Sequence, residues 1–125
     1  MKLPPAVIVH GLDDARLALS QALPVTLLSA PWAGVYGGVG WWRALLVAAE
    51  APASVINILD CGDSPGRALS ALRGGQRHLV LRAPPAVLAG ITARGGMVLP
   101  EPPAALDLGV PGGARRLAAW LAHAP

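Results

Sequence analysis

The stretch Val55-Ile56-Asn57-Ile58-Leu59-Asp60-Cys61-Gly62-Asp63-Ser64-Pro65-Gly66 joins an apolar run of strand length to the start of a helical pattern. Its polar cluster falls between the two elements, where α/β domains usually keep their chemistry. Pro65 suits the first turn of a helix, because its missing N–H has no intrahelical partner there. The segment therefore predicts a strand over 55–59 and a helix over 65–73.

The same alternation of strand-length and helix-length patterns continues along the chain. The predicted strands cover residues 6–10, 25–29, 55–59, 78–82 and 97–99. The predicted helices cover residues 13–23, 41–51, 65–73, 85–94 and 114–123, with loops at 30–40 and 100–111. Short connections between such units imply parallel strands and right-handed crossovers.

A chain of 125 residues with this pattern is expected to form one α/β domain, 1–125. Its strands lack a clean alternation of apolar and polar residues, which indicates burial on both faces. We therefore expect a three-layer, doubly wound sheet of about five parallel strands in the flavodoxin-like order 2-1-3-4-5. A half (β/α) barrel that assembles through pairs of chains has the same pattern and is the alternative.

The composition favours a protein that covers part of its surface with another copy of itself. Hydrophobic residues make 54% of the chain and charged residues 14%, against about 25% charged in a typical domain. The net charge of +3 comes from basic residues spread singly, which argues against nucleic-acid binding. We therefore expect a homo-oligomer with no nucleic-acid partner.

The sequence also excludes several other classes. A single cysteine rules out an intrachain disulfide and a cysteine-based zinc site, and no His spacing indicates a metal. The longest uncharged stretch covers residues 17–42. Its interior prolines and glycines interrupt it too often for a membrane helix. The first residues do not form a signal peptide. A cytoplasmic protein without a membrane partner is the expectation.

Candidate catalytic residues follow from the expected strand order. In the order 2-1-3-4-5, the loops after the first and third strands meet at the carboxyl edge of the sheet. This pairing would bring His10 beside Asp60 and Cys61, and we take these three as the candidate catalytic residues. Partial burial at the end of a strand would suit Asp60 to acid/base work. Asp63 or Ser64 is expected to cap the following helix.

The glycine-rich segment 30–40 offers a candidate ligand-binding loop, because backbone amides beside a helix N-terminus can hold an anion. It lacks the Lys and Ser/Thr of a P-loop, so no nucleotide fingerprint identifies a cofactor. The candidate ligand-binding residues are Trp32, Gly34, Tyr36, Gly37, Gly38, Gly40, Arg43 and Asp63. An equally weighted interpretation is that Trp32 and Tyr36 contact another subunit. Trp41 and Trp42 point about 100° apart on a helix, so one should pack inward and the other should contact a partner or cover a pocket.

Two resemblances concern the same segment. Cys61-Gly62-Asp63-Ser64 has the Cys-x-x-Ser spacing of monothiol glutaredoxin-like redox proteins, which implies a reactive Cys61. Residues 59–73 look like the phospho-acceptor region of response-regulator receiver domains, and this resemblance implies phosphorylation of Asp60. The chain departs from receiver domains at Arg82-Ala83-Pro84, where a Ser or Thr is expected, and at Pro100, where a lysine is expected.

The function expected from the sequence is therefore the binding of a small anionic molecule at the carboxyl edge of the sheet, with acid/base chemistry by Asp60 and His10. The alternative is a noncatalytic module with an enzyme-like fold that self-associates or docks on a partner through its apolar surface.

Overall fold

The computed structural model describes residues 2–123, in which strands and helices alternate. The strands are β1 (Ala6–Val9), β2 (Thr26–Ser29), β3 (Ile56–Asp60), β4 (His78–Val80), β5 (Met97–Leu99) and β6 (Ala105–Asp107). The helices are α1 (Leu12–Ser20), α2 (Ala33–Tyr36), α3 (Gly38–Ala48), α4 (Pro65–Arg73), α5 (Pro85–Ala93) and α6 (Gly113–His123).

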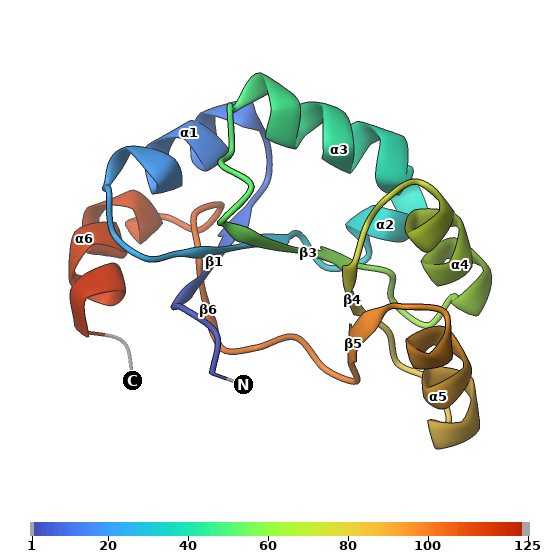
Figure 1. Cartoon of the computed structure of the whole chain (residues 1–125). Helices are drawn as coiled ribbons and strands as arrows, with labels where there is room; N and C mark the ends of the chain where they lie inside the picture. The colour runs from blue at the N-terminus through green and yellow to red at the C-terminus, as the bar shows by residue number, and fades with distance from the viewer. Residues whose placement is uncertain (1, 124–125) are drawn as a thin grey trace.

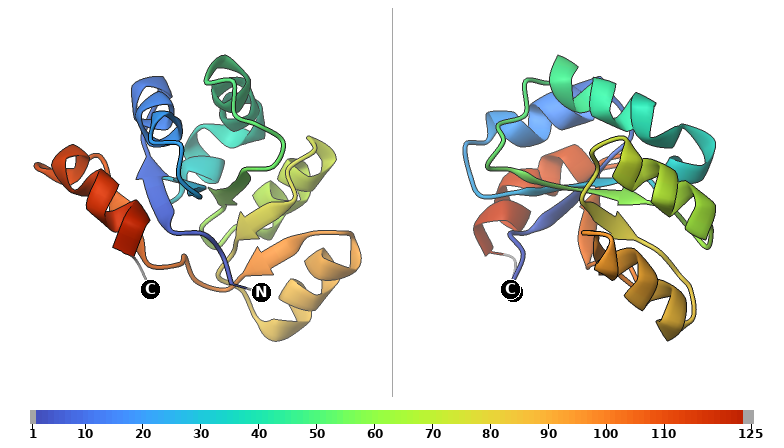
Figure 2. Two further views of the ribbon diagram at one scale, coloured as in Figure 1. Left: turned by 60° about the vertical axis from the view of Figure 1, so that its left-hand side comes forward. Right: turned by 45° about the vertical axis from the view of Figure 1, so that its right-hand side comes forward.

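The six strands form one sheet in which every neighbouring pair is parallel. Figures 1 and 2 show the sheet as a curved surface with helices around it. The α/β class predicted from the sequence, a parallel sheet flanked by helices as in flavodoxin-like folds, is confirmed. No helix among residues 2–123 has the length and apolar character needed to cross a membrane.

The predicted strand order 2-1-3-4-5 is wrong, because the observed order is β5-β4-β3-β2-β1-β6. From β1 to β5 each strand lies beside the next one in the chain, which is the sequential order of the half (β/α) barrel alternative. Consecutive helices consequently pack side by side, with α1 against α3, α3 against α4, and α4 against α5. The exception is β6, which pairs with β1 on the side opposite β2. The direction in which successive strands are added to the sheet therefore reverses between β1 and β6.

Two predicted loops contain secondary structure. The segment 30–40 contains α2 and the start of α3, so the third helical segment begins at Gly38 rather than at Trp41. The segment 100–111 contains β6, whose three residues pair with Ala6, Val7 and Ile8 of β1. Both elements depend on contacts with residues far away in the sequence, which a local hydrophobic pattern does not predict.

The two faces of the sheet pack differently. Apolar side chains on one face, including Leu27 and Leu59, form the larger core cluster with the helices. The alternate side chains Leu28, Ile58 and Val80 form a second cluster on the other face. Burial of both faces is therefore confirmed for the central strands, and their ends carry the polar residues.

Candidate functional site

The ends of β1 and β6 meet where the strand order reverses, which is the position at which α/β sheets most often bind ligands. His10 follows β1 and Asp107 ends β6. His10 Nε2 lies 2.6 Å from Asp107 Oδ1. Gly109 N–H donates to the same carboxylate oxygen at 2.7 Å, and the His10 backbone N–H donates to Asp14 Oδ2 at 2.9 Å. The carboxyl edge thus holds a hydrogen-bonded His–Asp pair.

The protonation state of this pair follows from its hydrogen bonds. Partial burial alone would raise the pKa of Asp107, but the hydrogen bonds from His10 and Gly109 outweigh it and the pKa is lowered. Asp107 is therefore an ionised acceptor at neutral pH, so His10 Nε2 must carry the proton of their hydrogen bond. This leaves Nδ1 as the ring nitrogen that can exchange a proton with another group, the arrangement of a general base oriented by a carboxylate.

A groove of about 630 Å³ extends from Asp107 between β6 and α6, and Arg116, Trp120 and His123 also line it. Gly109 keeps the pair in place on the other side. A Cβ atom at Gly109 would lie 2.5 Å from His10 Nε2, so a larger residue at this position would displace the imidazole from Asp107.

The predicted pairing of His10 with Asp60 is wrong, because β2 lies between β1 and β3. Strands two places apart in a sheet are separated by about 10 Å. Asp60 is only 1% exposed; its Oδ1 accepts from Gly62 N–H at 2.8 Å and its own N–H donates to Ser29 Oγ at 2.9 Å. These contacts give Asp60 a role in shaping the turn after β3.

Cys61 is fully buried, and burial, followed by the nearby charge of Asp60, raises the pKa of its thiol to about 12. A thiol with this pKa is not a nucleophile at neutral pH. The catalytic role predicted for Cys61, and the redox chemistry implied by the Cys-x-x-Ser resemblance, therefore do not fit its environment. No group of three or more His, Cys, Asp or Glu side chains within residues 2–123 could hold a metal ion.

The glycine-rich segment is helical and packed rather than open. Trp32 has φ of 65°, and its ring lies so close to Gly62 that a Cβ there would be 2.6 Å from it. Gly34 is buried, with its Cβ position 2.9 Å from the carbonyl oxygen of Asp60. Gly37 touches the ring of Trp41, so its small size serves packing as well.

The remaining predicted residues of this region do not form one site. Tyr36 is 83% exposed, and Gly38 and Gly40 begin α3 with open space beside them. Asp63 is exposed, and Ser64 caps α4 by accepting from Arg67 N–H at 3.2 Å. The residues predicted to bind an anion are thus spread over packed and exposed positions, and the predicted capping of α4 is confirmed for Ser64.

Arg43 lines a cavity of about 350 Å³ at the opposite edge of the sheet, where the strands begin. Arg77 and His78, at the start of β4, share this lining. The other lining residues are Asn57 and apolar or small residues of α3 and of the segment 51–56, so none of the described lining residues is acidic. The cavity combines three groups that can bind an anion with an apolar wall.

A buried amide network positions the polar side of this cavity. Gln76 is 1% exposed, and its Nε2 donates to Asn57 Oδ1 at 2.9 Å and to the carbonyl oxygen of His78 at 2.9 Å. Its Oε1 accepts from Arg43 Nη1 at 3.3 Å. Asn57 Oδ1 also accepts from Trp42 Nε1 at 3.1 Å. Because two donors hold Asn57 Oδ1, its amide nitrogen is left as a further donor beside the cavity.

The surroundings of His78 in this cavity shift its pKa. Burial, followed by the positive charge of Arg77, lowers the pKa of His78. The imidazole is therefore neutral at neutral pH. An anion bound beside it would offset both effects and favour its protonated form.

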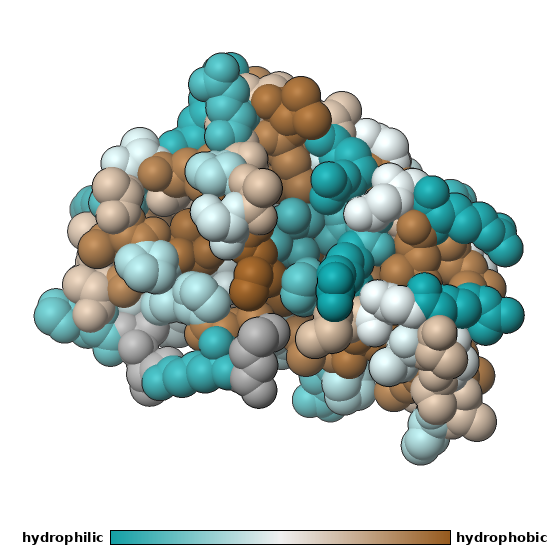
Figure 3. Space-filling model, in the orientation of Figure 1, coloured by the Kyte–Doolittle hydropathy of each residue, from teal (hydrophilic) through white to brown (hydrophobic). Residues whose placement is uncertain are grey.

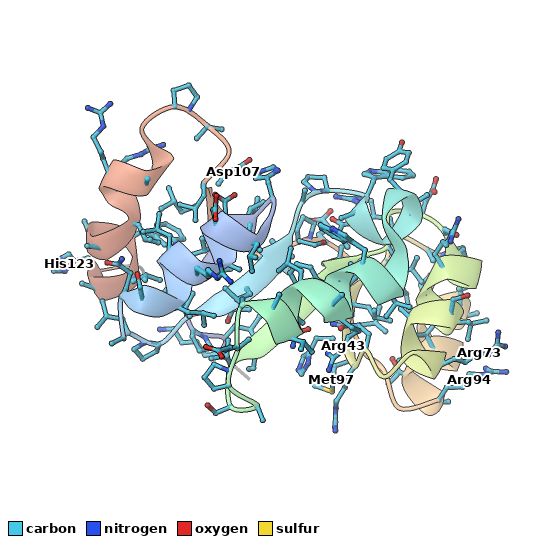
Figure 4. The ribbon with its side chains drawn as sticks, turned by 90° about the horizontal axis from the view of Figure 1, so that it is seen from above. Arg43, Arg73, Arg94, Met97, Asp107 and His123 are labelled. Atoms are coloured by element: carbon cyan, nitrogen blue, oxygen red, sulfur yellow. The ribbon has the colours of Figure 1, made fainter. Side chains whose placement is uncertain are left out.

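Acidic residues gather at the carboxyl edge of the sheet, whereas arginines lie at both edges. Six of the seven acidic residues lie where strands end or just after them, namely Asp13, Asp14, Asp60, Asp63, Glu101 and Asp107. Four arginines lie toward the edge where strands begin, namely Arg43, Arg73, Arg77 and Arg94. Figure 4 shows Arg43, Arg73 and Arg94 together on the side of the molecule away from Asp107. The field of the protein therefore favours anions at the beginning of the strands.

Fold and sites together define an α/β protein with a parallel sheet, a His–Asp pair at its switch point and a cationic cavity at its opposite edge. Comparisons with protein-family models, curated proteins and solved structures find no match for this chain.

Sequence reasoning missed Asp107, Arg77 and His78 as site residues. Asp107 lay in a segment predicted to be a loop, and its neighbour Leu106 gave only a weak strand signal. Arg77 directly precedes a predicted strand and His78 begins it, and this pair of basic residues was the available signal for the cavity.

Proposed function

We propose that this protein binds a small organic anion in the cavity between α3 and the starts of β3 and β4. The observation that carries the proposal is the lining itself, in which Arg43, Arg77 and His78 face a hollow without an acidic partner. The proposal keeps the anionic ligand expected from the sequence and assigns it to the opposite edge of the sheet. The acidic residues at the carboxyl edge would repel an anion there.

The chemistry of the lining defines the ligand class. Guanidinium groups bind carboxylates, phosphates and sulfonates through paired hydrogen bonds, and Asn57 supplies a neutral donor. Leu46 and Val47 belong to the apolar wall. A cavity of about 350 Å³ is at the small end of ligand sites. We therefore propose a ligand with one anionic group joined to a compact apolar body.

The test compares phenyl phosphate and benzenesulfonate with neutral benzyl alcohol and cationic benzylamine, using isothermal titration calorimetry and chemical-shift changes. We expect the two anions to bind and the other two compounds not to bind. Arg77→Gln should weaken anion binding about tenfold, the effect of losing one charged hydrogen bond. Arg73→Gln is the matched control, because Arg73 lies at the same edge but outside this cavity, and should leave the affinity unchanged.

Two results would reject the proposal. One is equal binding of the charged and neutral compounds, which would make the arginines irrelevant. The other is an equal loss of affinity in Arg77→Gln and Arg73→Gln, which would indicate attraction by overall charge rather than a site.

Proton transfer at the switch point is a second candidate function, and the 2.6 Å contact between His10 and Asp107 is the observation that favours it. Both side chains of the pair are partly exposed, so a substrate in the adjoining groove could reach the imidazole. This candidate retains His10 from the sequence-based prediction and replaces Asp60 with Asp107. A substrate of the groove should react more slowly with Asp107→Asn while its KM stays near that of the parent.

A further inference from the structure

The solvent face of α3 has no charged side chain. Three of the exposed large apolar residues lie on α3 or just before it: Tyr36 is 83% exposed, Val47 76% and Trp41 38%. Figure 3 shows apolar atoms reaching the surface over this helix. A helix that is apolar on all sides is normally buried, whereas here one side packs on the core and the other faces solvent.

The geometry of the helix shows how far this apolar face extends. At about 100° per residue, Val47, Gly40, Ala44, Ala48 and Trp41 fall in one arc of about 120°. The opposite arc carries the buried side chains, including Trp42, which is 0% exposed. The prediction that one of the two adjacent tryptophans packs inward is thus confirmed.

The nearest charges lie at the margins of this arc. Arg43 is turned toward Gln76 and lines the anion cavity. Arg16 of α1 hydrogen-bonds to the carbonyl oxygen of Ala48 at 3.5 Å, at the end of the helix. The centre of the arc, around Ala44, is free of charge among the described residues.

We propose that this face is covered by α3 of a second copy of the chain, packed antiparallel about a two-fold axis near Ala44. Gly40, Ala44 and Ala48 recur every four residues, so two helices can approach closely along this line. The large side chains flank it at opposite ends, Trp41 toward the start and Val47 toward the end. An antiparallel copy would place each large side chain over small residues of its partner, which is the self-complementarity that a two-fold interface requires.

The absence of charge on this face and its exposed area both support a second copy of the chain as the partner. Each copy carries a net charge of +3, and an uncharged face lets two copies meet without placing like charges together. From their exposed fractions and the usual areas of such side chains, Tyr36, Trp41 and Val47, with the small residues between them, expose about 500 Å² per copy. Two copies would bury on the order of 1,000 Å², the area at which specific interfaces begin. The interface and the proposed anion cavity are adjacent and share Val47, which belongs to the apolar wall of the cavity.

The test is the mass in solution, measured by analytical ultracentrifugation and light scattering. We expect the parent to sediment as a dimer, twice the 12.7 kDa of one chain, at about 100 µM. Ala44→Arg should be monomeric, because the axis would place two guanidinium groups against each other. Ala89→Arg is the matched control, since Ala89 is an exposed alanine on α5, and it should remain dimeric.

A cross-link gives a second measurement that does not depend on weakening the interface. Ala44→Cys should form an intermolecular disulfide under a mild oxidant, and Ala89→Cys should not, while the buried Cys61 stays reduced in both. A monomeric parent at 100 µM, on the order of the concentrations that populate weak dimers, would overturn the proposal. So would a dimer that persists in Ala44→Arg, or equal cross-linking of the two cysteine variants.

Discussion

His10 and Asp107 are 97 positions apart in the chain, yet His10 Nε2 and Asp107 Oδ1 are 2.6 Å apart at the carboxyl edge of the sheet. Their contact joins the strand that begins the sheet to the strand that is added last. Because β6 crosses back past β1, two residues from opposite ends of the chain meet where the strand order reverses. The candidate chemistry of this edge depends on that single reversal.

Asp107→Asn should lower the free energy of unfolding by less than about 1 kcal/mol, because both side chains of the pair are partly exposed. The folded-state pKa of Asp107 is lowered, so the stabilisation is present above the usual Asp pKa and is lost as the pH falls through the lowered value. Urea denaturation at pH 7 and at pH 3 should therefore show a difference between parent and variant that shrinks in acid. Glu101→Gln, which removes an exposed charge, should show no such change. A difference that grows in acid would contradict the lowered pKa.

Two glycines near the same helix should respond oppositely to alanine. Gly62 has φ of 58°, and its Cβ position overlaps the ring of Trp32, so Gly62→Ala should destabilise the fold by about 1–3 kcal/mol. Gly66 lies inside α4 with open space around it, so Gly66→Ala should stabilise by about 0.5–1 kcal/mol through helix propensity. Thermal unfolding of both variants checks the pair. Similar effects of the same sign would show that Trp32 does not rest on Gly62.

Anion binding should strengthen as the pH falls from 8 toward 6, the range in which histidines titrate. His78 is neutral because its pKa is lowered, and a bound anion favours its protonated form, so binding takes up a proton. Benzenesulfonate is a suitable probe because it stays ionised throughout this range. Calorimetry in buffers of different ionisation enthalpy measures the proton uptake. His78→Gln should abolish both the uptake and the pH dependence, and their persistence would assign them to another group.

Cys61 should resist alkylation in the native protein. Its pKa is raised to about 12, so at pH 8 almost no thiolate is present, and its side chain is fully buried. Iodoacetamide followed by mass spectrometry should find the native chain unmodified and the urea-unfolded chain fully modified. Rapid native alkylation would restore Cys61 as a reactive residue.

The local pattern of the sequence was sufficient for the elements that carry their own signals. The strand before Asp60 and the helix from Pro65 to Arg73 form as predicted, because an apolar run, a capping serine and a terminal glycine act over a few residues. By contrast, β6 has only three residues in a proline-rich segment, and its pairing with β1 alone makes it a strand. For the same reason the sequence placed His10 at the carboxyl edge of the sheet but did not identify Asp107 as its partner.

The sequence by itself determined an α/β chain with parallel strands, a buried strand ending at Asp60, and an excess of apolar residues. Only the tertiary structure decided the neighbours of each strand, and with them which polar side chains meet. Arg43, Gln76 and Arg77 come together because α3 packs beside β3 and β4, and His10 meets Asp107 because β6 lies next to β1. Hydrophobic periodicity specifies which face of an element is buried, whereas strand order depends on long-range pairing that no local run of residues encodes.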